Sequence, residues 1–194
     1  MTASGIPTVA VPPPPLRERR WLPPIVVSVV IAGVVFGGYA VAGSLSVPAG
    51  LPVTVGGVVR VFPLEGWEAA GTFTQPPGIR LAKGSGALDV AAVPFPGDEL
   101  ELLRQYVEEV LEPDADQLSV SEIGRVQLGG GRTGARAVYV GSFGDVQAPI
   151  EGQVTAVVTG SGDGVIFDGW APSGLLQYVI DDIEAMVANA EIEG

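Results

Sequence analysis

The stretch Ile25–Leu45, IVVSVVIAGVVFGGYAVAGSL, divides the chain into a short tail and a long remainder. It contains no charged residue and no amide side chain. Its length matches the roughly 20 residues that an α-helix needs to cross about 30 Å of hydrocarbon. The sequence therefore predicts an N-terminal tail over 1–24, a transmembrane helix over 25–45, a linker over 46–52 and one domain over 53–194.

Basic residues lie on only one side of this apolar stretch. Arg17, Arg19 and Arg20 precede it with only Glu18 against them, and the next basic residue is Arg60. Short positively charged flanks stay in the cytoplasm. We therefore expect a single-pass protein of the plasma membrane, with a cytoplasmic N-terminus and an extracytoplasmic C-terminal domain.

The end of the apolar stretch also fits a signal-peptide cleavage site, because Ala40-Val41-Ala42 has the small residues that signal peptidase accepts. The long, proline-rich tail and the continuation of the apolar run through this site favour an uncleaved anchor. Cleavage after Ala42 remains the alternative. Gly33 and Gly37 form a GxxxG pair, a spacing that lets two membrane helices pack closely.

Composition excludes several classes of function. The 194 residues include no histidine and no cysteine, which excludes metal and haem sites built on these side chains, Ser-His-Asp catalysis and a lipoprotein cysteine. Beyond residue 20 the chain carries seven basic and 21 acidic residues. A domain with this charge repels nucleic acid, so we expect no nucleic-acid partner. Because the chain has no histidine or cysteine, we also expect no cofactor.

The remainder predicts an α+β domain. Alternating or valine-rich segments indicate strands, two amphipathic segments indicate helices, and Asp98 with Glu101 forms a capping-box pair at the start of the first helix. Pro113 should stop that helix. The expected strands are 53–62, 78–82, 87–95, 118–128, 135–143, 153–159 and 165–169, and the expected helices are 98–112 and 174–189. This order favours an antiparallel sheet that buries a face under helices.

Motifs that would carry chemistry are few. Gly129–Gly134 matches the GxGxxG pattern of dinucleotide-binding proteins, but a strand rather than a helix should follow it, so we interpret it as a turn. A pair of carboxylates could hydrolyse glycans without histidine, yet the sequence places no such pair. The aromatic residues Trp67, Phe73, Phe95 and Trp170 could line a ligand groove; core packing is the alternative for them.

The segments VFPLEGWEAAG, GGGRTGAR and VIFDGWAPSG, in this order around a capped helix, resemble the Mog1/PsbP-like superfamily. Within it the chain is most similar to actinobacterial membrane-anchored proteins and LpqN-type envelope proteins. The resemblance covers about residues 51–192, and its most useful marks are Pro63, Gly66-Trp67 and Trp170-Ala171-Pro172. It implies an α/β/α sandwich without a common catalytic centre, in proteins that act mostly as binding or assembly factors.

Three hypotheses of function follow. The first is a non-catalytic, membrane-anchored binding or assembly module, an accessory factor of a membrane complex or of envelope lipid transport, with a membrane or envelope protein or a lipid as partner. The second is a small integral subunit held in a complex mainly by its transmembrane helix, through Gly33 and Gly37. The third is a carboxylate-dependent hydrolase of cell-wall glycans.

Overall fold

The computed structural model describes residues 51–144 and 148–193. The predicted anchor over Ile25–Leu45, with Gly33 and Gly37, lies outside the described residues, as does the proposed cleavage site after Ala42. Among the described residues, no helix has both the length and the apolar character needed to span a bilayer.

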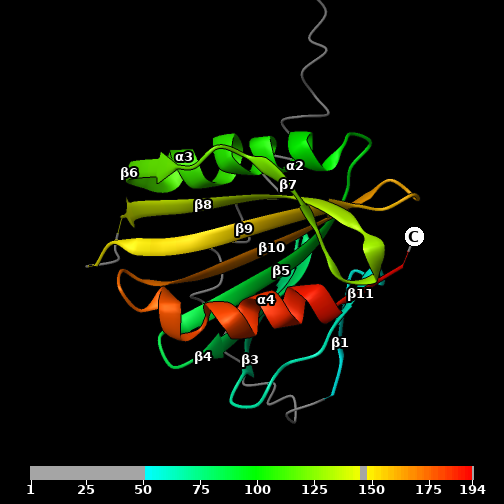
Figure 1. Ribbon diagram of the computed structural model, residues 1–194, viewed down its shortest axis with the longest axis horizontal. Coiled ribbons are helices and arrows are strands. Elements are labelled where there is room, and N and C mark those ends of the chain that lie inside the picture. Colours follow the sequence, from blue (N-terminus) through cyan, green and yellow to red (C-terminus); the bar gives the residue numbers. More distant parts are fainter. Residues whose placement is uncertain (1–50, 145–147, 194) are drawn as a thin grey trace, which may run out of the picture.

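An antiparallel sheet of eight strands forms the centre of the fold (Figure 1). Its order is β3-β4-β5-β10-β9-β8-β6, and β7 also pairs with β8. The pairing of β5 with β10 joins the first three strands to the rest of the sheet. The strands are β3 (Glu68–Thr74), β4 (Pro77–Lys83), β5 (Gly86–Pro94), β6 (Ala115–Val120), β7 (Gly124–Gln127), β8 (Thr133–Phe143), β9 (Ile150–Val158) and β10 (Asp163–Pro172).

A second sheet combines the two ends of the domain. It consists of β1 (Val53–Val55), β2 (Val59–Val61) and the C-terminal β11 (Glu191–Ile192). The sequence predicts one strand over 53–62, and the structure instead has a hairpin there. Gly56 and Gly57 take φ values of +60° and +73°, which only glycine adopts readily, and they reverse the chain within the valine-rich run.

The first helix begins as predicted. The backbone N–H of Glu101 donates to Asp98 Oδ1 over 2.8 Å, and the backbone N–H of Asp98 donates back to Glu101 Oε2 over 3.4 Å, which completes a capping box. The helical segment comprises α2 (Glu99–Tyr106), a π-helical turn η2 (Val107–Leu111) and α3 (Glu112–Asp114). Pro113 lies inside α3, and the helical path ends at Asp114, two residues later than predicted.

Two other predicted elements differ from the structure. The expected strand over 118–128 is divided into β6 and β7, which both pair with β8 and are separated by Ser121–Ile123. The last helix, α4 (Ile180–Asn189), begins later than predicted, after a short 3₁₀ turn η4 (Leu176–Tyr178). The strand β3 was not predicted, because it lies at the edge of the sheet and exposes every second residue.

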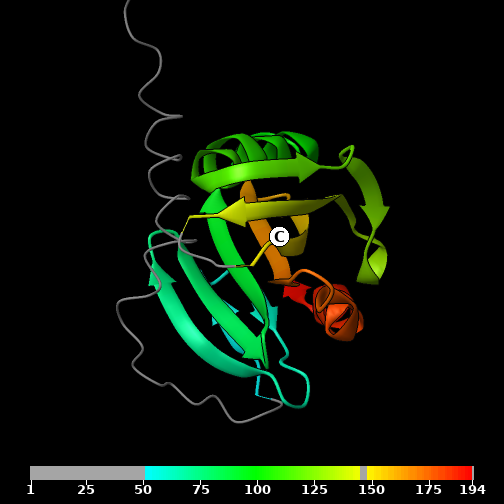
Figure 2. The ribbon, with the colours of Figure 1, turned by 90° about the vertical axis from the view of Figure 1, so that its left-hand side faces the viewer.

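The main sheet buries a hydrophobic core on each of its faces. Leu102, Leu103 and Val110 of the first helical segment cover one face. On the other face, Ile183 and Met186 of α4 pack in a cluster that also contains the valines of β1 and β2. Figures 1 and 2 show α2 and α4 on opposite sides of the twisted sheet. The predicted α+β architecture, an antiparallel sheet between helices, is confirmed.

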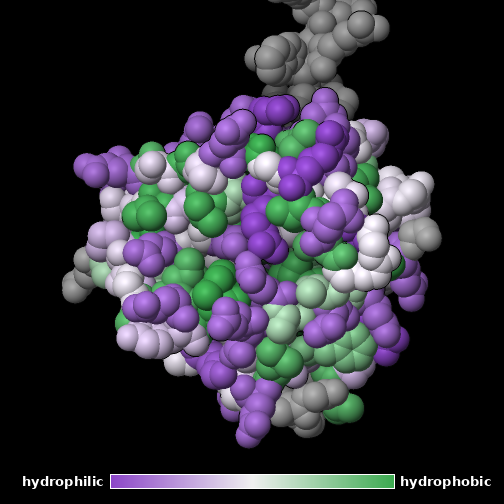
Figure 3. Space-filling model, viewed as in Figure 1, coloured by the Kyte–Doolittle hydropathy of each residue, from purple (hydrophilic) through white to green (hydrophobic). Residues whose placement is uncertain are grey.

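The face that carries α4, β8 and β9 is mainly hydrophilic, with hydrophobic patches between the polar side chains (Figure 3). In Figure 1, α4 lies over the β5 and β10 side of the sheet and away from β8. Val138 and Val140 of β8 are accordingly 49% and 48% exposed, whereas their neighbours Ala137 and Tyr139 are buried on the face toward α2.

Candidate functional site

The register between β5 and β10 places two carboxylates opposite each other. Asp89 lies near the middle of β5, and its partner across the strand pair is Asp168 of β10. Asp89 is 4% exposed and Asp168 is 2% exposed. Burying a carboxylate is unfavourable unless other groups hydrogen-bond to it, so the partners of these two acids define the most unusual site in the core.

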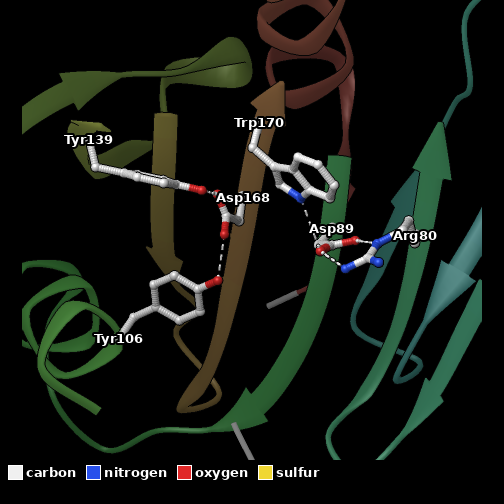
Figure 4. A network of polar contacts seen from close by, with 6 residues as sticks. All are labelled: Arg80, Asp89, Tyr106, Tyr139, Asp168 and Trp170. Atoms are coloured by element: carbon white, nitrogen blue, oxygen red, sulfur yellow. Dashed lines mark hydrogen bonds and ion pairs between the residues drawn. The ribbon is translucent and has the colours of Figure 1, made fainter. Parts of the chain in front are cut away.

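Asp89 forms a bidentate ion pair with Arg80 of the neighbouring strand β4. Arg80 Nε and Nη2 each donate to one carboxylate oxygen of Asp89 over 2.6 Å. The indole N–H of Trp170 also donates to Asp89 Oδ2, over 3.4 Å. The guanidinium of Arg80 lies 5.4 Å from the ring centroid of Trp170 and 5.8 Å from that of Phe73, within the range of cation–π attraction. Figure 4 shows Trp170 and Arg80 on either side of Asp89.

Asp168 is held by two tyrosines from different elements (Figure 4). The hydroxyl of Tyr106, on α2, donates to Asp168 Oδ2 over 2.6 Å, and the hydroxyl of Tyr139, on β8, donates to Oδ1 over 3.0 Å. Gly152 of β9 gives the Tyr139 ring its space, because a Cβ at this position would lie 2.3 Å from the ring. The carboxylate therefore connects the first helical segment to two strands of the sheet.

Burial and charge shift the pKa values of this polar network, which comprises Arg80, Asp89, Tyr106, Tyr139, Asp168 and Trp170. Burial raises the pKa of Asp168 to about 7, and the nearby charge of Asp89 adds to the increase, while the tyrosine hydroxyls oppose it. Burial also raises the pKa of Asp89, and the hydrogen bonds and charge of Arg80 offset part of this effect. The pKa values of both tyrosines lie well above their ordinary value because of burial and the neighbouring Asp168, so they act as donors.

The pKa of Asp168 lies near neutral pH, but the hydrogen bonds to Asp168 and Asp89 leave these carboxyl groups little freedom to act as an acid or a base. Both oxygens of Asp168 accept hydrogen bonds from tyrosines, and both oxygens of Asp89 accept from Arg80. The geometry instead fixes α2, β8, β10, β5 and β4 relative to one another. Over residues 51–144 and 148–193, no group of three or more acidic side chains is arranged to hold a metal ion.

The opposite face has its own polar contacts, which attach α4 to the sheet. Asp182 Oδ2 accepts from the indole N–H of Trp67 over 2.9 Å and from Lys83 Nζ over 2.7 Å. The hydrogen bonds from Lys83 and Trp67 lower the pKa of Asp182. Arg136 Nη1 of β8 donates to Glu184 Oε1 over 2.8 Å. The helix α4 is thus held partly by ion pairs that remain accessible to solvent.

The fold matches a solved structure from a cyanobacterium. The solution structure of the cyanobacterial PsbP protein CyanoP, from Synechocystis sp., superposes with a TM-score of 0.54 at 13% identity and covers 80% of this chain and 99% of its own. The chain has a Mog1/PsbP-like fold. The predicted resemblance is thereby confirmed at the level of the fold.

Two further structures are similar over most of the domain. The Ran-binding protein Mog1p from Saccharomyces cerevisiae has a TM-score of 0.49 at 12% identity and covers 73% of this chain and 94% of its own. LpqN, involved in cell envelope biogenesis of Mycobacterium tuberculosis, has a TM-score of 0.48 at 13% identity and covers 76% of this chain and 87% of its own. No family model matches the sequence, and no curated protein matches it.

In this Mog1/PsbP-like fold, the sequence marks of the resemblance occupy turns and strand ends. The backbone N–H of Trp67 donates to Leu64 O over 3.0 Å, in a turn where Gly66 has a φ of +81°. Trp170-Ala171-Pro172 forms the last three residues of β10. Both marks therefore correspond to places where the chain leaves or enters the main sheet.

The four aromatic residues of the predicted groove do not meet. Trp67 is fully buried in the core cluster against α4, and Phe95 is buried in the cluster under α2. Phe73 and Trp170 are brought together, because both rings lie near the guanidinium of Arg80. Trp67 therefore lies on the opposite face of the sheet from Phe95 and Trp170, which both pack in the cluster under α2.

Reasoning from the sequence missed the acids at the centre of the site. Each interrupts an otherwise apolar strand, Asp89 in ALDVAAVPF and Asp168 in VIFDGW, and a charged residue in such a strand is a signal for a paired, buried acid. Tyr106 and Tyr139 could not be identified as partners, because 62 and 29 residues separate them from Asp168. The prediction of a turn at Gly129–Gly134 is confirmed by the 3₁₀ turn η3 (Gly129–Gly131) between β7 and β8.

Proposed function

We propose that this chain is a single-pass membrane protein whose C-terminal domain is a non-catalytic binding or assembly module. The domain would lie at the outer face of the plasma membrane and serve as an accessory factor of a membrane complex or of envelope lipid transport. Its partner would be another membrane or envelope protein, or a lipid. The Mog1/PsbP-like fold supports the binding class, because the resemblance implies binding and assembly roles.

The observation that carries the proposal is the state of the buried acids. Glycan hydrolysis needs two carboxylates that face a cleft, one to protonate the leaving group and one to act as base or nucleophile. Asp89 and Asp168 are the buried carboxylates of the described residues, and their oxygens are occupied by Arg80, Tyr106 and Tyr139. This speaks against the hydrolase hypothesis for this pair and favours a structural role for the polar network.

The proposed topology follows from the charge asymmetry around 25–45, and it can be tested directly because the chain has no cysteine. Glu108 lies exposed on the first helical segment, so Glu108→Cys should react in whole cells with a maleimide that does not cross membranes. Ser4→Cys, in the predicted cytoplasmic tail, is the matched control and should react only after lysis. The opposite labelling pattern would contradict the proposed topology. Intact mass of the purified protein tests cleavage after Ala42.

The binding role is tested by purification from native membranes in mild detergent, with mass spectrometry of co-purifying proteins and lipids. Two variants separate the hypotheses. In the first, an unrelated transmembrane helix replaces residues 25–45; in the second, Gly33 and Gly37 are both changed to isoleucine. If the domain binds the partner, both variants keep it at the wild-type ratio. Loss of the partner from both variants would instead support the subunit held by its transmembrane helix. Absence of any partner or lipid from the wild type would contradict the proposal.

A further inference from the structure

A small pocket lies at one end of the sheet, away from the polar network. Its volume is about 290 Å³. It is formed by the start of β8, the end of β9 with the following turn, and the C-terminal strand β11. The lining residues are Arg132, Thr133, Val157, Val158, Thr159, Gly160 and Ile192. The pocket thus combines one cation and two hydroxyls with apolar side chains.

The glycine-rich turn before β8 brings Arg132 to this pocket. Gly129 packs so closely on α4 that a Cβ at this position would lie 1.9 Å from the carbonyl oxygen of Ala188. This contact places Arg132 where its Nη2 donates to the carbonyl oxygen of Ala190, just after the end of α4. Its Nε–H is buried and has no hydrogen-bond acceptor among the described residues. The guanidinium is therefore fixed in position with unused donor capacity.

Among the described residues, Arg132 also has no charged partner, although the domain is strongly acidic. Five of the seven basic residues in the described ranges form ion pairs with acidic side chains of the same ranges. Arg104 and Arg132 do not. Arg104 is exposed on α2, whereas Arg132 is partly buried and lines the pocket. A partly buried cation that pairs with none of the 20 acidic residues in the described ranges indicates a position kept for an anion from outside.

We infer that this pocket binds a monocarboxylate that carries a short apolar group. The guanidinium of Arg132 would pair with the carboxylate, which matches its planar set of donors. Val157 and Ile192, which pack in the same hydrophobic cluster, would contact the apolar group.

The charge and size of the surroundings select this ligand class over phosphate. A dianion would enter against the repulsion of a domain with excess negative charge, and it would leave the apolar wall without a partner. A carboxylate on a branched chain of four or five carbons fits about 290 Å³. The same chemistry occurs in a free acid and in the C-terminal residue of a peptide. The inference deepens the proposed binding function, and its test does not depend on which partner co-purifies.

The test is an NMR titration of the full-length protein in detergent micelles with sodium isovalerate, with isovaleramide as the neutral analogue. Isovalerate should shift the Arg132 Nε–H and the backbone amides of Thr159 and Gly160, with a dissociation constant on the order of 1 mM, as expected for one charged contact and a small apolar area. The amide and inorganic phosphate should bind at least about tenfold more weakly. Equal binding of isovaleramide, or stronger binding of phosphate, would overturn the inference.

Two variants sharpen the result. Arg132→Gln should weaken isovalerate binding at least about tenfold, whereas Arg104→Gln, at the other basic residue without an ion pair, should leave it unchanged. Because Arg132→Gln also loses the contact with Ala190 and could fail to fold, Ile192→Ala provides a second test: it should weaken isovalerate binding several-fold and leave the weaker binding of acetate unchanged. Unaltered isovalerate binding in Ile192→Ala would contradict an apolar contact.

A comparison with acetyl-glycyl-valine identifies the source of the ligand. If the pocket receives the end of a peptide, this probe should bind at least about tenfold more tightly than isovalerate. If it receives a free acid, the longer probe should bind no better. A complete absence of saturable binding by both probes would overturn the inference for this pocket and would leave the co-purification test of the domain unaffected.

Discussion

Lowering the pH from 8 to 5 should stabilise the domain, because of the buried carboxyl group of Asp168. Burial raises its pKa from 3.8 to about 7 in the folded protein, so between these values the folded state holds a proton that the unfolded state has released. Stability falls with rising pH wherever the folded state binds more protons. At about 1.4 kcal/mol per pKa unit, the change between pH 5 and pH 8 amounts to about 3 kcal/mol.

The other carboxyl groups with shifted pKa values do not oppose this effect between pH 5 and pH 8. The chain has no histidine. The pKa values of Asp182 and Glu151 are lowered by hydrogen bonds, from Lys83 and Ser173 respectively, so their stabilising contacts are lost only at pH values below about 4. The pKa of Asp89 shifts upward like that of Asp168 and acts in the same direction. We therefore expect the domain to be more stable at pH 5 than at pH 8.

Urea unfolding of residues 51–194 at several pH values, followed by circular dichroism, measures the effect. With an m-value of about 1.5 kcal/mol/M, the midpoint should rise by about 2 M between pH 8 and pH 5. In Asp168→Asn, an uncharged amide replaces the acid, and the change should shrink to less than about 1 kcal/mol. Asp116→Asn, at an exposed position of β6, should keep the wild-type dependence. An identical pH dependence in wild type and Asp168→Asn would refute the reasoning.

Three further substitutions test individual contacts through the free energy of unfolding. Arg80→Met leaves the carboxylate of Asp89 buried without its ion pair and should destabilise the domain by about 3–5 kcal/mol, whereas replacing both residues with apolar ones should recover much of the loss. Gly129→Ala forces its methyl group against α4 and should cost about 1–3 kcal/mol. Asp98→Ala removes the cap of α2 and should cost about 1 kcal/mol; a loss under about 0.3 kcal/mol would show that the cap contributes little.

The sequence predicted correctly those elements that depend on residues close to one another in the chain. The capping box at Asp98 needs only two side chains three residues apart, and the hairpin turn after Lys83 needs only glycine at the right place. The predictions failed where a segment's neighbours determine its structure. The glycines inside 53–62 permit either a strand or a turn, and in the structure they form the turn that pairs β1 with β2. The edge strand β3 lacks the apolar run that a buried strand shows.

Of the polar network, only the two buried acids could be predicted from the sequence. An aspartate within an apolar strand indicates a buried acid that needs partners, and both Asp89 and Asp168 give this signal. Which groups supply those partners depends on the strand register and on where α2 crosses the sheet. Tyr106 and Tyr139 have no sequence feature that distinguishes them from ordinary core tyrosines, so their role follows only from the three-dimensional arrangement.

The network also explains how the central strand pair keeps its register. Both β5 and β10 are rich in small and apolar residues, and a slip of two positions would keep every side chain on its own face of the sheet. Such a slip would also move Asp168 away from the hydroxyls of Tyr106 and Tyr139 and leave its carboxyl group buried without donors. An unsatisfied buried acid costs several kcal/mol. The two carboxylates thus favour the one pairing of β5 with β10 that joins the two halves of the sheet, which gives the charged groups in the core a structural role.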